Sequence, residues 1–303
     1  MRNGLPSGEQ IEIRSGDQQV VVVEVGAGLR SYTVEGRDVL DGYAADEMAG
    51  AGRGQVLMPW PNRIEDGAYE FRGTRHQLAL TEPDAGNAIH GLVRWLAWSV
   101  AARDGDRVVL EHTLYPQPGY PFSLALRIEY ALSEEGLRVT STATNVGGEA
   151  CPYGSGAHPY LTLGVESVDA LLLRAPARTV LRSGPRGLPG DAAPVEGTEY
   201  DFRRPREIGG TKLDDAFTDL ERDDDGLART ELRDPQSGRA LSLWLDQSYG
   251  YLQLFTGDAL ASVNRRSLAV EPMTCPPNAF RTGEALTVLE PGESTTAAWG
   301  IAA

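Results

Sequence analysis

Apolar and polar residues alternate with a period of two along most of the chain. Examples are the runs QIEIRS, DRVVLEHTLY, SLALRIEYAL, LRVTSTATNV and ALSLWLDQ. This alternation is typical of half-buried β-strands, whose successive side chains point to opposite faces of a sheet. No long stretch carries apolar residues at the i, i+3, i+4 and i+7 positions of an amphipathic helix. The sequence therefore predicts an all-β protein with few, short helices.

Turn residues separate the predicted strands, and 35 glycines and 19 prolines are spread over the 303 residues. Strands that follow one another without intervening helices pair antiparallel, which favours a sandwich or a barrel. The absence of a repeat of fixed period disfavours propellers and solenoids. Segment 183–220 is rich in Gly, Pro, Asp and Arg and either links two domains or, as we favour, runs over one sheet. The acidic segment 221–226 is typical of an exposed turn.

The composition excludes several classes of protein. The formal net charge is −15, so the chain would repel a phosphate backbone, which argues against a nucleic-acid partner. No apolar run approaches the ~18 residues of a membrane span. The N-terminal segment lacks the apolar centre of a secretion signal. We therefore expect a cytoplasmic protein without a membrane partner.

Metal binding and disulfide bonding are not expected. Cys151 and Cys275 are the only two cysteines, and in a reducing compartment two cysteines are most simply free thiols. The sequence contains neither a CxxC nor an HExxH motif, which are the common patterns of zinc ligands.

Four histidines are candidates for proton transfer near neutral pH. His158 stands in YGSGAHPYL, where small neighbours leave room for a bound molecule, and His90 stands in NAIHGL, next to a glycine. A functional role is therefore open for both, with His158 the stronger candidate. His76 and His112 lie in predicted strands and are expected on exposed faces.

Acidic and basic residues add further candidates. Glu271, in SLAVEPMTCPPNAF, ends a predicted apolar strand. Partial desolvation at the rim of the core would raise its pKa and suit it to act as a base, unless it pairs with an arginine. Asn62 and Arg63 lie in MPWPNRIEDG, either at a site that binds hydroxyls or a carboxylate or in a surface turn. Aromatic faces suit the C–H faces of sugars, although filling a core is their commoner role, and three lie near these segments: Trp60, Trp95 and Tyr160.

Eight segments, in order, resemble parts of the aldose 1-epimerase (galactose mutarotase) family. They are PNRIEDGAYEFRG, NAIHGL, GYPF, GAHPYLTLG, KLDDAF, YLQLFTG, VEPMTCPPNAF and LEPGESTTAAWGI. Each is weakly specific alone, but the ordered set spans nearly the whole chain. The resemblance implies an isomerase with one large antiparallel β-supersandwich, a single domain over residues 1–303, and an open cleft for a small-molecule sugar.

The resemblance also implies roles for individual residues. Glu271 matches the base that removes the proton of the anomeric hydroxyl, and His158 matches the acid that protonates the ring oxygen. Since one acid and one base suffice, no cofactor and no metal are expected. Ordinary pKa values, about 6.5 for His and about 4.3 for Glu, suit these roles, and a nearby carboxylate such as Asp214 is expected to keep His158 protonated. The residues expected to bind the sugar are Asn62, Arg63, His90, Asp214 and Gln253.

The chain departs from the better-known galactose enzymes beside the expected pocket. The segment HPYL replaces a sequence closer to HTYF, Met273 replaces Gln, Asn278 replaces Asp, and Gly91–Leu92 replaces a double glycine. These changes leave the acid and the base in place, but they leave the preferred sugar open. They resemble a bacterial side branch of the family.

Two alternative functions stay open on the sequence alone. A hexose-6-phosphate mutarotase would need a basic cluster for the phosphate, for which Arg265–Arg266 and Arg203–Arg204 are candidates unless they are solvated loop charges. A non-catalytic sugar-binding protein would not need both His158 and Glu271, which weighs against it. Whether the protein is a monomer or a homodimer is also open.

Overall fold

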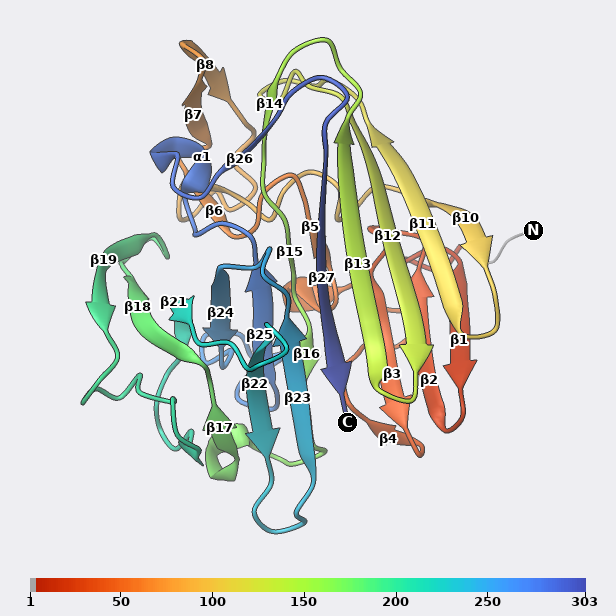
Figure 1. Cartoon of the computed structure of the whole chain (residues 1–303), viewed down its shortest axis with the longest axis vertical. Helices are drawn as coiled ribbons and strands as arrows, with labels where there is room; N and C mark the ends of the chain where they lie inside the picture. Colours follow the sequence, from red (N-terminus) through yellow and green to blue (C-terminus); the bar gives the residue numbers. More distant parts are fainter. Residues whose placement is uncertain (1–3) are drawn as a thin grey trace.

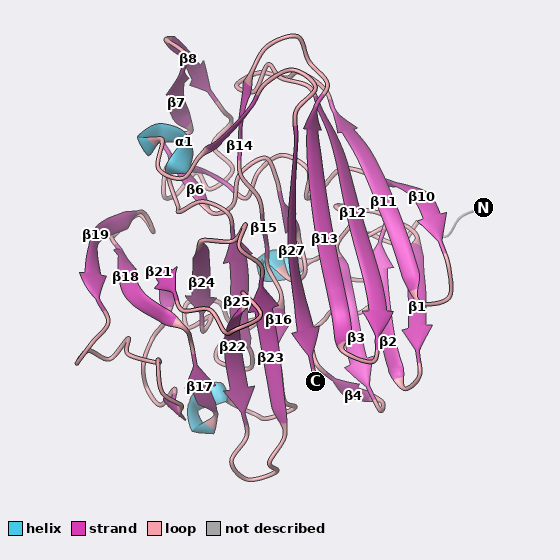
Figure 2. Ribbon diagram, in the orientation of Figure 1, coloured by secondary structure: helices cyan, strands magenta, loops and turns pink. Residues whose placement is uncertain are grey.

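The structure is a computed structural model that describes residues 4–303. Among these residues the regular elements are strands, apart from one short α-helix and two 3-10 turns: α1 (Ala279–Thr282), η1 (Gly50–Gly52) and η2 (Val168–Ala170). Figures 1 and 2 show long strands lying side by side and little helix. The predicted all-β class with few, short helices is confirmed.

The larger of the two main sheets has nine strands, all paired antiparallel. In β12 and β13 buried and more exposed residues alternate, so one face of each packs on the core. In spatial order the strands are β10 (Ser99–Arg103), β11 (Arg107–Leu114), β12 (Leu124–Ser133), β13 (Gly136–Asn145), β27 (Ser294–Ala302), β23 (Ala240–Leu245), β22 (Ala228–Arg233), β17 (Leu172–Arg174) and β20 (Arg206–Glu207).

The second main sheet has eight strands, and it carries the candidate site. Its two central strands, β24 and β25, are buried on both faces and therefore lack a polar–apolar alternation. The strands are β19 (Pro189–Pro194), β18 (Ala177–Ser183), β21 (Asp214–Leu220), β24 (Tyr251–Phe255), β25 (Leu268–Met273), β15 (Gly156–Ala157) and β5 (Val56–Leu57), with β16 (Tyr160–Leu161) also paired to β25.

Smaller sheets complete the fold. A four-stranded sheet is formed by β1 (Gln10–Ser15), β2 (Gln18–Val23), β3 (Leu29–Val34) and β4 (Arg37–Asp38). Three strand pairs are formed by β14 (Cys151–Tyr153) with β26 (Thr287–Leu289), β6 (Arg63–Glu65) with β9 (Asn87–Ile89), and β7 (Ala68–Phe71) with β8 (Thr74–Gln77).

The main hydrophobic core joins both large sheets. Ile128 and Val139 of the nine-stranded sheet belong to the same buried cluster as Leu252 and Val270 of the eight-stranded sheet. Side chains alternate along a strand, so the neighbours of Leu252 and Val270 on β24 and β25 point to the opposite face. The eight-stranded sheet therefore has one face on the core and a second face available for a site.

Several local predictions can be compared with the structure. Segment 183–220 is not a bare linker, because it supplies β19 and β21 to one main sheet and β20 to the other. Segment 221–226 is a largely exposed turn, as predicted. Both cysteines are free and buried. His76 and His112 are partly buried rather than fully exposed.

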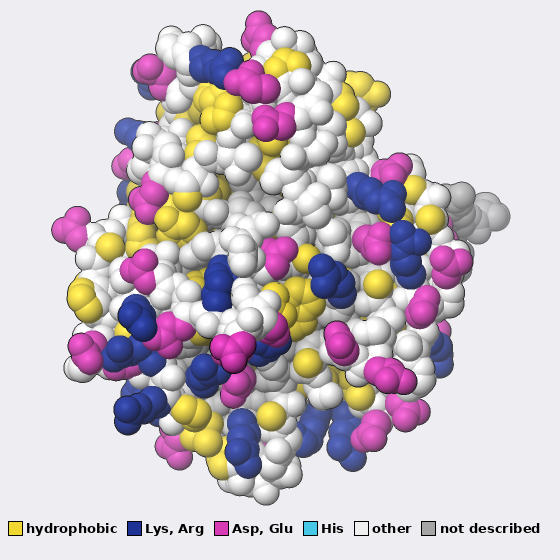
Figure 3. All heavy atoms as spheres, in the orientation of Figure 1, with side chains coloured by type: hydrophobic (Ala, Val, Ile, Leu, Met, Phe, Trp, Pro, Cys, Tyr) yellow, Lys and Arg dark blue, Asp and Glu magenta, His cyan; other side chains and the backbone are white. Residues whose placement is uncertain are grey.

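The surface carries both signs of charge. Figure 3 shows acidic and basic side chains interspersed over one face, so the net charge does not gather there into a patch of one sign. Within residues 4–303 no helix has the length and apolar character required to cross a bilayer.

Candidate active site

Three polar side chains project from adjacent strands on the second face of the eight-stranded sheet. Gln253 of β24 lies directly opposite Glu271 of β25 and Ala216 of β21. Asp214 is two residues before Ala216, so its side chain shares that face. The Gln253 Nε2 donates a hydrogen bond to the Asp214 Oδ1 over 2.9 Å. Strand pairing thus brings together residues that are far apart in the sequence.

These side chains form the floor of a cleft of about 660 Å³. This volume is in the ordinary range for small-molecule sites. The walls come from loops around η1, from the β6–β9 region and from the segment after β24. All of the site residues predicted from the sequence line this cleft: Asn62, Arg63, His90, His158, Asp214, Gln253 and Glu271.

The imidazole of His158 is held on three sides. It stacks on the ring of Tyr160, with centroids 4.9 Å apart and planes 12° from parallel, while the ring of His90 meets it edge-on at 5.4 Å. The Tyr160 hydroxyl donates to the Ala51 carbonyl over 2.8 Å. The backbone of Gly52 covers the third side, where a Cβ would stand 2.7 Å from the His158 Cδ2. Gly52 also has φ +75°, which favours glycine.

Glu271 lies beside this imidazole. The distance from the His158 Nε2 to the Glu271 Oε1 is 3.4 Å, and the two residues are only 5% and 2% exposed. The prediction that Glu271 ends its strand at the rim of the core is wrong, because β25 continues through Pro272 and Met273. The carboxyl group is therefore more deeply buried than expected.

Burial shifts the two pKa values in opposite directions. Loss of hydration, together with the positive charges of Arg94 and Arg63, lowers the pKa of His158 to about 3. Burial also raises the pKa of Glu271 well above its usual range, helped by the negative charge of Asp214. The expectation that Asp214 keeps His158 protonated is thus wrong. Asp214 acts on the carboxyl group instead, where its negative charge favours the protonated form.

Four buried polar atoms around the cleft have no hydrogen-bond partner among residues 4–303. They are the His90 Nδ1, the His158 Nδ1, the Gln253 Oε1 and the Glu271 Oε2. Buried polar groups in folded proteins are nearly always hydrogen-bonded. Their concentration along one cleft is typical of a site that binds a polar ligand.

The β6–β9 pair positions His90. The His90 N–H donates to the Asn62 carbonyl over 2.9 Å, and the Asn62 Oδ1 accepts from the Arg63 N–H over 2.9 Å. A Cβ on Gly91 would lie 2.0 Å from the Met58 carbonyl oxygen, so only glycine fits after His90. These contacts explain why the short sequence NAIHGL turns at this point.

Comparison with known proteins identifies the family of the chain. The family model described as aldose 1-epimerase matches residues 9–301. The chain belongs to the aldose 1-epimerase family.

The chain is also similar to individual proteins. The chain is 37% identical over 288 residues to the uncharacterized protein YihR of Escherichia coli (strain K12), covering 95% of this chain and 91% of YihR. It is 30% identical over 247 residues to the maltose epimerase of Levilactobacillus brevis, covering 73% of this chain and 71% of that enzyme. The crystal structure of the GalM/aldose epimerase homologue from C. elegans has a TM-score of 0.85 at 18% identity, covering 97% and 98% of the two chains, which shows a shared fold.

In this aldose 1-epimerase family member, Arg63 is fixed by a neighbouring carboxylate. Its Nε and Nη2 donate to the two carboxylate oxygens of Glu82 over 2.8 and 2.9 Å, and its Nη1 donates to the Gly187 carbonyl over 3.3 Å. The guanidinium lines the cleft, but these contacts engage much of its donor capacity. A direct bond from Arg63 to a sugar stays a prediction.

Sequence reasoning missed two charged residues of the cleft, Arg94 and Glu82. Arg94 has no carboxylate within ion-pair distance in the described part of the chain, and its nearest polar partner is the Gln55 Oε1 at 3.5 Å. Burial lowers the pKa of Arg94. The only signal in the sequence was the short distance of Arg94 from His90.

The arginines proposed for a phosphate group are engaged elsewhere. Arg265 pairs with Asp169 and Asp258, and Arg266 pairs with Asp41. Arg203 pairs with Asp201 and Glu196, and neither arginine pair lines the cleft. These candidate arginines therefore do not supply a phosphate site at the cleft.

The unusual residues near the predicted pocket also lie outside its lining. Leu92, Pro159, Met273 and Asn278 do not line the cleft. The Asn278 Oδ1 instead accepts a hydrogen bond from the Glu65 N–H over 3.0 Å. These residues therefore do not form part of the surface of the cleft.

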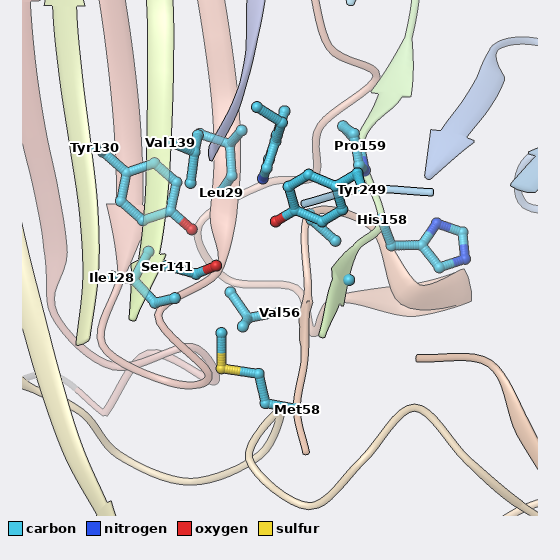
Figure 4. A pocket seen from close by; sticks show the side chains of 14 residues that line it. Leu29, Val56, Met58, Ile128, Tyr130, Val139, Ser141, His158, Pro159 and Tyr249 are labelled. Atoms are coloured by element: carbon cyan, nitrogen blue, oxygen red, sulfur yellow. The ribbon is translucent and has the colours of Figure 1, made fainter. Parts of the chain in front are cut away.

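A second, much smaller cavity lies behind the backbone of His158. Its volume is about 10 Å³, enough for about one water molecule. Figure 4 shows the hydroxyls of Tyr130, Ser141 and Tyr249 around it and the imidazole of His158 pointing away from it. Within residues 4–303 no group of three or more His, Cys, Asp or Glu side chains could hold a metal ion. The cleft lined by all seven predicted residues is the candidate active site.

Proposed function

We propose that the protein is an aldose 1-epimerase that interconverts the α and β anomers of a free aldose resembling glucose or galactose. The observation that carries this proposal is the buried pair of His158 and Glu271, 3.4 Å apart at one cleft. A pure binding protein has no need of an acid and a base in contact. The family assignment supports the same reaction class.

The proposed reaction balances with these two groups alone. Glu271 takes the proton of the anomeric hydroxyl while His158 donates a proton to the ring oxygen. The bond between the anomeric carbon and the ring oxygen breaks, and the electron pair of the anomeric O–H bond forms the carbonyl. Rotation about the adjacent C–C bond presents the other face of the carbonyl, and the reverse steps close the ring. Nothing is oxidised or reduced.

The pKa shifts make the charged arrangement that starts this cycle the less favoured one. Ring opening starts with the proton on His158 and ends with the proton on Glu271, so the pair holds one proton throughout. Burial favours the neutral arrangement, with the proton on Glu271. The open-chain stage is thereby stabilised relative to the charged arrangement that starts the reaction.

The remaining polar residues of the cleft are proposed to bind the sugar. Neutral His90, whose pKa burial lowers well below its usual value, offers one donor and one acceptor to hydroxyls. Asp214 and Gln253 offer acceptors, and Asn62 and Arg63, which line the same cleft, are proposed to contact the sugar as well. We also propose that the chain forms a single domain, since one core cluster includes residues of both main sheets.

The proposal predicts faster anomer exchange of a free aldose. Pure α-D-glucose or α-D-galactose is dissolved with and without the protein, and optical rotation is followed to equilibrium. We expect faster approach to the same end point, unchanged by EDTA because the reaction uses only acid and base groups. Acceleration of a 6-phosphate alone would favour the hexose-6-phosphate mutarotase. Binding without acceleration of any sugar would favour the non-catalytic protein.

The pH dependence of kcat/KM is expected to report the inverted pair. Activity is expected to fall at low pH, along the acid limb of the profile, when the His158–Glu271 pair binds a second proton. It is expected to fall at high pH, along the alkaline limb, when the pair loses its last proton. Since burial lowers the pKa of His158 to about 3, the acid limb is expected there rather than at an ordinary carboxyl value of about 4.3. The charge of Asp214 raises the pKa of Glu271, so Asp214→Asn is expected to move the alkaline limb to lower pH.

Both limbs are measured by polarimetry wherever circular dichroism shows the fold intact. The pH at the midpoint of a limb does not depend on the maximum value of kcat/KM. A weaker affinity of Asp214→Asn for sugar therefore does not obscure the result. An alkaline limb that stays in place or moves upward contradicts the assignment.

A further inference from the structure

Large apolar side chains gather at the mouth of the cleft. Met48 is 62% exposed, Trp95 46% and Leu260 39%, and all three line the cleft. They come from three separate segments, one before η1, one after β9 and one after β24. Exposed apolar groups that cluster beside a polar site mark a binding surface. We call these three side chains the apolar mouth.

Trp95 is held in place at this mouth. The guanidinium of Arg94 lies over the indole, 5.6 Å from the ring centroid, a separation at which a cation and an aromatic face attract. Arg94 also lines the cleft. The indole is thereby oriented on one side by a neighbour, while 46% of the residue stays exposed to a ligand.

The cleft has more room than one sugar ring needs. A hexose has twelve non-hydrogen atoms. If each atom is given the ~30 Å³ of a whole water molecule, which is generous, the hexose fills about 360 Å³. The cleft measures about 660 Å³. His158 and Glu271 are almost fully buried, whereas the three residues of the apolar mouth are exposed. A ring that reacts at His158 and Glu271 would therefore leave room in the cleft towards the mouth.

We propose that the apolar mouth binds a second sugar ring linked to the reacting one, and that Trp95 determines a preference for reducing disaccharides over the free monosaccharide. This inference rests on the proposed function, because it places the anomeric carbon beside His158 and Glu271. Pyranose rings present a face of C–H groups, and an indole offers the flat apolar surface that matches it. Met48 and Leu260 flank the second ring with apolar contacts.

The test compares glucose with disaccharides whose reducing end is glucose, linked through O4 (maltose) and through O6 (isomaltose). Anomer exchange is measured by magnetisation-transfer NMR, which reports each sugar at equilibrium. We expect kcat/KM to be higher for at least one disaccharide than for glucose. Trp95→Ala is expected to lower that ratio about tenfold, and Trp95→Phe is expected to retain most of it.

A matched control is Tyr115→Ala, which removes an aromatic side chain that is 72% exposed and does not line the cleft. Its ratio is expected to equal that of the unmodified protein. Acceleration of glucose with no preference for either disaccharide, or with a ratio unchanged in Trp95→Ala, overturns this inference and leaves the proposed function intact. A failure to accelerate any free sugar overturns the proposed function itself.

Discussion

Glu271→Gln is expected to lower kcat for anomer exchange by about 10²–10⁴-fold, the usual contribution of a positioned acid–base group. The amide has nearly the shape of the carboxyl group and can still bond to a hydroxyl, but it cannot take up a proton. Polarimetry gives the loss of rate, and calorimetric titration shows whether the sugar still binds. Retained binding with lost turnover assigns Glu271 to the chemistry rather than to affinity.

This variant is expected to fold. Burial raises the pKa of Glu271 because the charged carboxylate is poorly hydrated at its position, and a neutral amide avoids that cost. Thermal unfolding should therefore occur at or above the temperature found for the unmodified protein. Glu70→Gln, on the exposed part of β7, is the matched control and should leave kcat unchanged. Activity within threefold of normal in Glu271→Gln would rule out its role as the base.

The sequence predicts the strands best where each strand has one face on the core and the other towards solvent. Strands β12 and β13 are of this kind, and their alternation is visible in the letters alone. Strands β24 and β25 are covered on both faces, so their apolar runs carry no periodic signal. For this reason the sequence placed Glu271 at the end of its strand, whereas pairing extends beyond it.

The membership of the site could be predicted, but its electrostatics could not. The ordered segments carry all seven predicted residues, and all seven line one cleft. Strand pairing brings three of them together, Asp214, Gln253 and Glu271. The pKa values of His158 and Glu271 depend on burial, which neighbouring letters do not reveal. The ion-pair partners of the arginines cannot be predicted from the sequence either. Arg266 pairs with Asp41, which is 225 positions away, so the two adjacent arginines looked available for a phosphate.

Gly52→Ala is expected to lower kcat about 10²-fold, although residue 52 has no side chain to take part in the chemistry. The added Cβ would stand 2.7 Å from the Cδ2 and 3.0 Å from the Nε2 of His158. The ring cannot yield freely, because Tyr160 stacks on it and His90 meets its edge. The Nε2 would therefore shift relative to Glu271, and a displacement of about 1 Å in a reacting group can cost about 10²-fold in rate.

Backbone strain is the competing explanation, since Gly52 has φ +75° and an alanine there costs roughly 1–2 kcal/mol. Two controls separate the effects. Gly36→Ala imposes similar strain at φ +73° with no atom within 4 Å of the new Cβ. Gly50→Ala lies in the same turn, and its Cβ would meet only the Arg53 Nη1, at 3.8 Å. Neither control should lower kcat.

The decisive comparison is between stability and rate. Gly52→Ala and Gly36→Ala should lose similar thermal stability, while only Gly52→Ala loses turnover. A drop in kcat at nearly constant KM identifies displacement of the acid rather than damage to the cleft. If Gly52→Ala keeps kcat within twofold of normal, the His158 ring can move without loss of activity. In that case its close packing against residue 52 would have no part in the reaction.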